Sequence, residues 1–369
     1  MKYWRGYLVA AILLLCNWAL VQFCASHTEL IDMVYPYVDR IVMDYLAGWS
    51  ANFAGCLWQT ILVFLMVVVV AGVVLMIIMR WNPIQLIGWV LAIVSIFPLL
   101  NTAMYGINQY SGPISDDIRL ELQEYSVDTL ESAAIYYRDL ANEYTDQVAR
   151  NSNGTIREKK FDELTAQAAN GFETLSYDRV FPIFTGTTIP VKELGWAERY
   201  DGVTGMTVGM TGESAVNPNV PAVGMPFAIC HEMSHRMCIY HDADADFAAF
   251  LACTHNESDY FVYSGYLLAF RACYNGLAAI GSKDSDRALD RVMSGVDPRV
   301  MDDIEEYNRF LGDKATKADE DLCKLLVSWH IQEVVTKAEL EEEQVEFDPM
   351  DETFEPLQNV VKPYPEEES

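Results

Sequence analysis

The sequence predicts a mainly α-helical membrane protein: about three N-terminal transmembrane helices, then a mostly helical body with a small region of strands and loops. Two observations support this class. Three long apolar segments lie within the first 105 of the 369 residues, whereas most of the charge lies after them. In the body, apolar residues recur near the 3.6-residue period of a helix, except between residues 180 and 223, where Gly, Pro and Thr are frequent.

The three apolar segments cover about residues 7–26, 61–79 and 84–104. Each is close to the roughly 20 residues that a helix needs to cross the hydrocarbon core of a bilayer. Basic residues precede the first segment as in a signal peptide, but no small-residue cleavage site is well placed and a second span follows. We therefore expect residues 1–105 to form a membrane anchor, with the lipid bilayer as a partner.

Basic residues also predict the orientation of the anchor. Lys2 and Arg5 precede the first span and Arg80 lies in the short turn between the second and third, whereas the loop of residues 27–60 contains only Arg40 and several acids. By the positive-inside rule, the N-terminus and the short turn face the cytoplasm. Three crossings then place the body outside, which predicts a multi-pass protein of the cell membrane with an extracytoplasmic body.

The loop between the first two spans has a pattern of its own. Residues 29–46 carry apolar side chains at helical spacing. Such a helix would lie on the outer membrane surface or pack on the body, and the sequence favours neither.

Charge is segregated along the chain. Residues 1–110 contain four basic and four acidic residues, so the net charge of −28 lies entirely in the remainder. A body this acidic would repel phosphates, which excludes nucleic acid as a partner. Residues 337–369 are rich in Glu, Asp and Pro, and we expect them to form a disordered acidic tail.

The body, residues 106–336, is expected to form eight helices around the strand-and-loop region. These helices cover residues 116–148, 158–175, 225–239, 242–251, 259–280, 284–294, 300–311 and 319–335. Five cysteines lie in the body, an odd number without paired spacing, which is not typical of a disulfide framework. Cys230 and Cys238 are therefore interpreted as small buried apolar residues.

The most informative stretch is His231-Glu232-Met233-Ser234-His235, which reads H-E-x-x-H. Residues four apart on a helix lie on one face, so both imidazoles can reach one cation. Glu232 lies on the turn between them and can accept a proton from a metal-bound water. This is the arrangement of zinc peptidases. It makes His231 and His235 candidate metal ligands, Glu232 the candidate general base and Zn²⁺ the expected cofactor.

A catalytic zinc site needs a third protein ligand and one open position. Asp242 and Asp246 are four residues apart at the start of the next predicted helix and would share a face. Asp242 is the preferred third ligand. Asp246 is then the carboxylate that orients a ligand imidazole from behind.

Two other residues compete with Asp242 for this position. His241 is one, because His231-x-x-x-His235-x-x-Cys238-x-x-His241 has the metzincin spacing, with Cys238 in place of the Gly that eases the turn. Asp244 is the other. A helix N-terminus whose carboxylates complement the helix dipole would explain the acids without any metal.

Four segments of the body carry a family resemblance. They are T-G-E-S-A-V-N from Thr211, P-F-A-I-C-H-E-M-S-H from Pro226, D-A-D-A-D-F-A-A-F-L-A-C from Asp242 and Y-S-G-Y from Tyr263. With Y-G-I-N from Tyr105, they resemble the bacterial membrane family described as domain of unknown function 3810. The resemblance covers roughly residues 60–275. It implies a membrane anchor and a zincin-like domain, an HExxH zinc metallopeptidase without a known substrate.

The chain departs from that family pattern at four positions. Asp242 and Asp244 stand where Glu is usual, Asp246 where Asn is usual and Cys238 where Gly is usual. Asp is shorter than Glu by one methylene, so a metal-binding Asp242 would require its helix to approach the site more closely.

These observations predict a membrane-anchored zinc metalloendopeptidase, a hydrolase that acts on a peptide or protein substrate with Glu232 as general base. Its oxyanion donor would be Tyr263, Tyr266 or His330. Residues 211–223 would form the strand edge that receives an extended substrate.

Two alternatives stay open. The first is a catalytically inactive, membrane-anchored interaction module with a structural or degenerate metal site, in which Cys230 or Cys238 would supply a fourth ligand. The second places the catalytic domain in the cytoplasm, which requires that the first span is cleaved or does not insert. The sequence indicates neither the cleavage specificity nor the oligomeric state.

Overall fold

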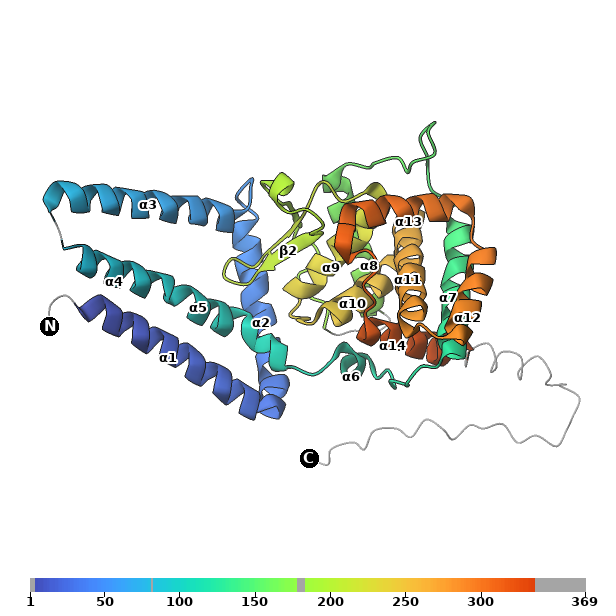
Figure 1. Cartoon of the computed structure of the whole chain (residues 1–369), viewed down its shortest axis with the longest axis horizontal. Coiled ribbons are helices and arrows are strands. Elements are labelled where there is room, and N and C mark those ends of the chain that lie inside the picture. The colour runs from blue at the N-terminus through green and yellow to red at the C-terminus, as the bar shows by residue number, and fades with distance from the viewer. Residues whose placement is uncertain (1–3, 81, 178–182, 336–369) are drawn as a thin grey trace, which may run out of the picture. The chain divides into compact units, whose positions relative to one another are not determined.

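The computed structural model describes residues 4–80, 82–177 and 183–335. The chain divides into two units, Met1–Ser328 and Trp329–Ser369. It is mainly helical, with three long apolar helices near the N-terminus and one small three-stranded sheet (Figure 1), which confirms the predicted fold class. The predicted acidic tail lies outside the described residues. Of the second unit, the structure describes the end of α14 (Glu320–Trp329) and a π-helix, His330–Val335.

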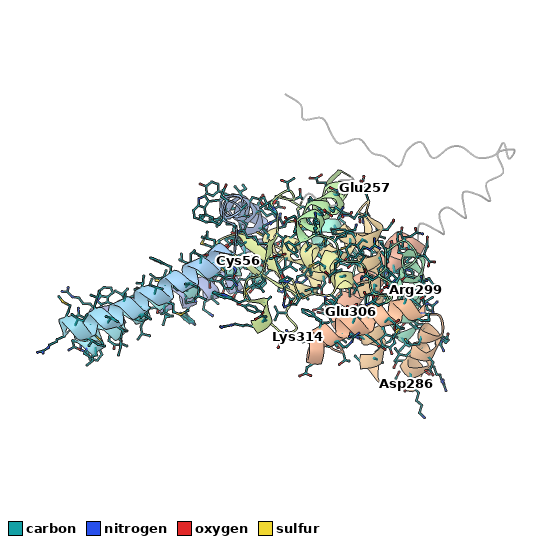
Figure 2. The ribbon with its side chains drawn as sticks, turned by 90° about the horizontal axis from the view of Figure 1, so that it is seen from above. Cys56, Glu257, Asp286, Arg299, Glu306 and Lys314 are labelled. Carbon is teal, nitrogen blue, oxygen red and sulfur yellow. The ribbon has the colours of Figure 1, made fainter. Side chains whose placement is uncertain are left out.

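Three helices are long and apolar enough to cross a membrane, as predicted. They are α1 (Arg5–Ser26), α3 (Leu57–Met79) and the segment Pro83–Met104, which consists of α4 (Pro83–Val94) and α5 (Ile96–Met104). The apolar side chains of α3 project outward along its length in Figure 2, and no residue of its most apolar stretch is buried. Between α1 and α3 lies α2 (Thr28–Ser50), the helix expected at residues 29–46.

The helices of the body follow in chain order. They are α6 (Ile114–Ile118), α7 (Val127–Tyr144), α8 (Phe161–Tyr177), α9 (Met225–Arg236), α10 (Asp242–Thr254), α11 (Asp259–Ile280), α12 (Lys283–Ser294), α13 (Pro298–Leu311) and α14.

The single helix predicted at residues 116–148 is wrong. The chain leaves the helix at Arg119, whose φ of 58° is left-handed, and begins again as α7 after Ser126. Ser126 and Thr129 form a reciprocal capping box at that start. The apolar periodicity runs on across the break, which is why it concealed the second N-terminus.

The sheet contains β1 (Lys192–Glu193), β2 (Gly205–Val208) and β3 (Glu213–Val216) in the order β1-β3-β2. β3 pairs antiparallel with β2 and parallel with β1. The prediction that residues 211–223 form the edge is therefore wrong, because β3 within that range is the central strand. The edge beside the H-E-x-x-H motif is β2.

The core of the body surrounds α10. Its apolar side chains are almost completely buried, and α8, α9 and α11 pack against it. Helix α8 approaches so closely that a Cβ at Gly171 would lie 1.9 Å from the carbonyl oxygen of Ala252. This packing fixes the start of α10, where the acidic cluster lies, relative to α9.

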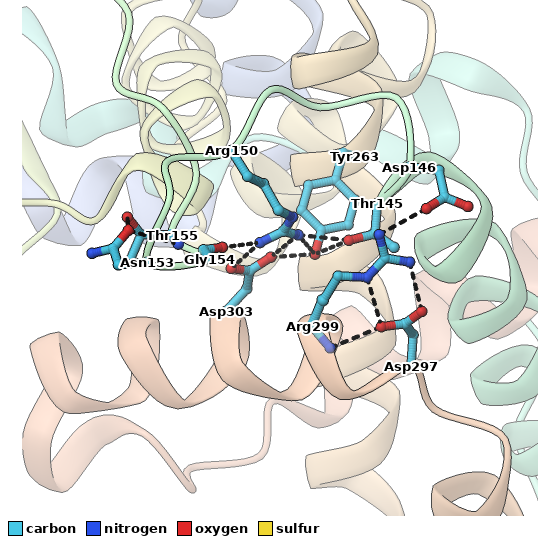
Figure 3. A network of polar contacts seen from close by, with 10 residues as sticks. All are labelled: Thr145, Asp146, Arg150, Asn153, Gly154, Thr155, Tyr263, Asp297, Arg299 and Asp303. Carbon is cyan, nitrogen blue, oxygen red and sulfur yellow. Dashed lines mark hydrogen bonds and ion pairs between the residues drawn. The ribbon is translucent and has the colours of Figure 1, made fainter.

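A polar network ties the loop after α7 to α11 and α13 (Figure 3). Arg150 forms two hydrogen bonds with the buried Asp303 carboxylate, at 3.0 and 2.7 Å, and the Tyr263 hydroxyl donates to the same carboxylate at 2.5 Å. Arg299 is paired with Asp297 and Asp146 nearby. The buried Asp303 carboxylate is thus paired with Arg150, and Tyr263 has a structural partner.

Candidate metal centre

The H-E-x-x-H motif lies on α9, as its spacing predicted. Pro226 occupies the first turn of this helix, where its missing N–H costs nothing. The helix ends at Arg236, and Cys238 then adopts a left-handed φ of 67°. This turn leads to His241, the N-cap residue of α10, and brings the first turn of α10 beside His235.

Three of the predicted ligands converge. Ligand atoms of His231, His235 and Asp242 all lie within 4.8 Å of one another, and His235 Nε2 is 3.5 Å from Asp242 Oδ1. A tetrahedral zinc ion with ligands at about 2.0–2.2 Å separates neighbouring ligand atoms by about 3.3–3.6 Å. The donor set therefore fits a zinc ion, and so does the distance between His235 and Asp242.

Each imidazole is held through its Nδ1 atom. His231 Nδ1 is 2.6 Å from Asp246 Oδ1, and His235 Nδ1 is 2.8 Å from the carbonyl oxygen of Ile239. When Nδ1 donates to these acceptors, Nε2 presents its lone pair to a cation. Burial lowers the pKa of His231, but the Asp246 carboxylate outweighs burial and raises that pKa to about 9. Asp246 thus lies behind the imidazole of His231, the position predicted for a carboxylate that orients a ligand histidine.

Glu232 is buried beside this group, with 3% of its surface exposed. Its Oε2 accepts a 2.7 Å hydrogen bond from the Thr207 hydroxyl on β2. Gly205, also on β2, leaves room for it, because a Cβ there would lie 2.5 Å from Cγ and Oε1 of Glu232. Burial is the main cause that raises the pKa of this carboxyl. Ser214 donates to the backbone carbonyl of Glu232 at 2.7 Å and fixes the helix to the sheet.

The two competing ligands do not join this group. The His241 side chain is exposed, and its ring is not part of the group of converging ligand atoms. Asp244 is buried on another side of α10, where it lines two separate cavities and accepts a hydrogen bond from the backbone of Ile114. Burial raises its pKa to about 6. The geometry thus favours Asp242 over both alternatives.

Neither flanking cysteine belongs to the group. The thiol of Cys238 is 3.5 Å from Asp39 Oδ2 on α2, and Cys230 is buried in the core next to Cys253. Both are free and buried, which confirms the sequence interpretation. Among the described residues, the ligand group therefore contains two imidazoles and one carboxylate but no sulfur.

The motif lines a cavity of about 740 Å³. Around the histidines and Glu232, its walls come from β2, from the ends of α5 and α9, and from α11 and α13. Side chains that the sequence had not indicated include Thr207, Tyr105, Tyr240, Arg271 and Tyr307. No local spacing marks these residues. Tyr240 lies in the turn after α9, whereas strand pairing and helix packing bring the others to the motif from far along the chain.

Two of the three oxyanion donors expected from the sequence, Tyr263 and Tyr266, belong to the first unit, and neither lines this cavity. Tyr263 donates to Asp303, and the Tyr266 ring lies against that of Tyr144, 5.8 Å away. His330 belongs to the second unit. Three other tyrosines line the cavity instead: Tyr105 and Tyr240, whose rings are 5.3 Å apart, and Tyr307.

The family model described as "Protein of unknown function (DUF3810)" matches residues 31–326. The chain belongs to this family. No curated protein and no solved structure matches it. The DUF3810 match extends beyond the resemblance at residues 60–275 in both directions, and it includes most of α2 and all of β2, α9, α10 and α13.

Proposed function

We propose that this DUF3810 protein is a membrane-anchored, zinc-dependent metallopeptidase that hydrolyses peptide bonds. One observation carries the proposal: His231, His235 and Asp242 converge at the wall of a large cavity, with the buried carboxylate of Glu232 beside them. Two imidazoles and one carboxylate are a ligand set of catalytic zinc sites, which keep a fourth position open.

The residues that would hold the ion are His231, His235 and Asp242, with Asp246 behind His231. Once bound, zinc would supply Lewis acidity, which lowers the pKa of water and polarises a carbonyl group. Glu232 and His235 are buried at this site, whereas the Asp242 side chain is 85% exposed and borders the solvent.

Glu232 would move the proton in this reaction. The Thr207 hydroxyl occupies Oε2, which leaves Oε1 to accept a proton from the attacking water and to donate it to the leaving amine. Burial raises the carboxyl pKa toward neutrality and so strengthens it as a base. Tyr105 and Tyr240 line the cavity and are the proposed oxyanion donors in place of the tyrosines named from sequence.

β2 would position the substrate. Among the strands that the structure describes, it pairs with β3 along one side only, and residues 202–207 line the cavity. An extended peptide could add to this edge through main-chain hydrogen bonds, which orient it independently of its side chains. This is the role that the sequence had assigned to residues 211–223.

The positive-inside rule supports an extracytoplasmic position for the catalytic body. An alkaline-phosphatase fusion at about residue 340 should therefore be active. An inactive fusion, together with an active fusion between the second and third spans, would support the cytoplasmic alternative.

The inactive interaction module remains the alternative function. A structural zinc site is closed by four protein ligands, and a cysteine would have to supply the fourth. The Cys238 thiol faces Asp39 and Cys230 faces the core, so the described geometry favours an open site.

The test compares full-length protein in nanodiscs as wild type, Glu232→Gln and Glu257→Gln. Glu257 is exposed on the body (Figure 2) and serves as the matched control. We expect about one zinc ion in each protein and cleavage of a peptide library by wild type and Glu257→Gln, with a loss of about 10²–10⁴-fold in Glu232→Gln. Zinc without cleavage in all three would support the inactive module, and no zinc in any of them would overturn both.

A further inference from the structure

Helix α2 (Thr28–Ser50) has two opposite faces of different character. One face is buried against the body and contributes Ile31, Pro36, Asp39, Arg40, Met43, Ala47 and Ser50. The other exposes large apolar side chains, namely Leu30, Met33, Val34, Tyr37, Val38, Ile41, Val42, Tyr45 and Trp49. The exposed fraction reaches 70% at Met33, 72% at Ile41 and 75% at Tyr45, so this face has no partner within the described chain.

The exposed residues form one continuous stripe. From Leu30 to Tyr45 they alternate in steps of three and one, which at about 100° per residue keeps them on one side of the helix. An apolar stripe of this length is unusual on a surface that faces water. The composition of α2 is not that of a helix that crosses a bilayer, because it contains five charged residues: Glu29, Asp32, Asp39, Arg40 and Asp44. α2 is also not among the three candidate spans.

The position of α2 indicates what covers the stripe. α1, the first candidate span, ends at Ser26, and α2 begins two residues later at Thr28. At the other end, α3 begins at Leu57, where the Glu213 carboxylate on β3 accepts the backbone N–H groups of Leu57 and Trp58 at 2.7 and 2.9 Å. α2 therefore connects the end of α1 to the start of α3, and Figure 1 shows α2 running across the ends of the candidate spans.

We propose that the exposed face of α2 lies in the interfacial layer of the lipid bilayer and holds the metal centre at the membrane surface. A helix with one apolar face and few net charges binds in this layer, parallel to the membrane plane. Tyr37, Tyr45 and Trp49 lie on the same face, and such rings favour the boundary between hydrocarbon and water.

The buried face of α2 connects directly to the turn that follows the metal-binding helix. Arg40 Nε donates to the carbonyl oxygen of Met237 at 3.0 Å, and Asp39 Oδ2 accepts from Cys238 Sγ at 3.5 Å. Met237 and Cys238 come just after His235. The hairpin of the sheet is close as well, since a Cβ at Gly212 would lie 2.6 Å from the backbone nitrogen of Ala47.

The cavity also adjoins the end of the last span. Tyr105 follows α5 directly and lines the cavity together with Glu232. A site at this height would act on peptide segments close to the membrane surface, such as the membrane-proximal part of another anchored protein. This consequence for substrate rests on the proposed peptidase function, whereas the lipid contact of α2 does not.

The test places an environment-sensitive fluorophore on single cysteines in the full-length protein. Cys16→Ser removes the exposed native thiol, and the other seven cysteines are buried. Met33→Cys, Ile41→Cys and Tyr45→Cys report on the stripe, and Asp286→Cys on the exposed surface of α12 is the control (Figure 2). Each is reconstituted in phosphatidylcholine liposomes, with and without acyl chains brominated near the headgroup.

We expect brominated lipid to quench the three stripe labels and aqueous iodide to leave them unchanged, with the reverse at residue 286. Stripe labels that iodide quenches as strongly as the control would overturn the proposal. Labels shielded from both quenchers, with shielding that disappears on dilution into excess lipid, would also overturn it in favour of a second copy of the chain.

A separate assay addresses the substrate. A peptide that wild type cleaves is presented free and on a lipid anchor, and the anchored form should have the lower apparent KM in liposomes. Cleavage of both forms with equal KM would contradict the membrane-proximal substrate. Failure to cleave any peptide would contradict the proposed function, while the quenching result would still decide the position of α2.

Discussion

Replacement of Asp246 tests whether His231 is a metal ligand. Asp246 Oδ1 lies 2.6 Å from His231 Nδ1 and fixes the ring so that Nε2 is available on the side of Asp242. Asp246→Leu removes this acceptor at similar size. Asp246→Asn keeps an oxygen acceptor, and Asn is usual there in the family pattern.

The expected magnitude follows from the contact. Loss of such a supporting carboxylate lowers metal affinity by about 10–100-fold, or about 1.4–2.7 kcal/mol. The Asp246 side chain is 31% exposed, so water partly replaces it and the effect should lie near the lower end, about tenfold for Asp246→Leu. Asp246→Asn should stay within about threefold of wild type, because its oxygen still accepts the Nδ1 proton.

The assay is a competition titration of zinc between the purified full-length protein and a fluorescent chelator. Thermal unfolding without metal checks that both variants fold. Wild-type affinity in Asp246→Leu, or an equal loss in both variants, would refute the assignment of Asp246 as the residue that orients His231.

Three further predictions follow from other contacts. Thr207→Val should lower kcat by about 10–100-fold while zinc content and KM stay near wild type, because a hydrogen bond to the Glu232 carboxylate is lost. Thr207→Ser keeps the hydroxyl and should retain activity. A fully active Thr207→Val would show that the hydroxyl does not position Glu232. Asp303→Ala removes the carboxylate that pairs with the buried Arg150 and should lower the free energy of unfolding, measured with urea, by about 3–5 kcal/mol. The partner of Asp297, Arg299, is more exposed, so Asp297→Ala should lower it by about 1 kcal/mol. Equal losses in the two variants would contradict this difference. Burial raises the pKa of Asp39 to about 6, above its ordinary 3.8, so stability that is present below about pH 4 is lost as the pH rises through 6. The thermal stability of Asp39→Asn relative to wild type should therefore increase between pH 4 and 7. A constant difference across that range would refute this expectation.

The motif helix and its acidic partners could be predicted because the information is local. His231 and His235 share a face by their spacing, and so do Asp242 and Asp246. The sequence could not settle the choice among Asp242, His241 and Asp244, since that depends on how the turn after α9 directs α10. In the structure, only Asp242 of the three joins the histidines.

The turn itself shows how distant residues override a local expectation. Cys238 stands where Gly is usual, and its left-handed φ of 67° costs a residue with a side chain about 1 kcal/mol. Contacts from α2 offset that cost, since Asp39 accepts from the thiol and Arg40 binds the carbonyl oxygen of Met237. Neither contact is visible in a pattern, because about 200 residues separate the partners along the chain.

The sheet was predicted only in outline for the same reason. The region between residues 180 and 223 has the composition of loops and short strands, but the order β1-β3-β2 depends on pairing rather than on composition. Thr207 and Gly205 therefore emerged as neighbours of Glu232 only from the structure.

X-ray absorption spectroscopy at the zinc edge tests the central claim most directly. The spectrum of zinc-loaded, full-length protein should show only nitrogen and oxygen neighbours at about 2.0–2.2 Å, with the outer-shell signature of two imidazoles, and His231→Ala should remove one of these. A sulfur neighbour at about 2.3 Å would contradict the account, because it would show that a cysteine closes the site and that the zinc is structural.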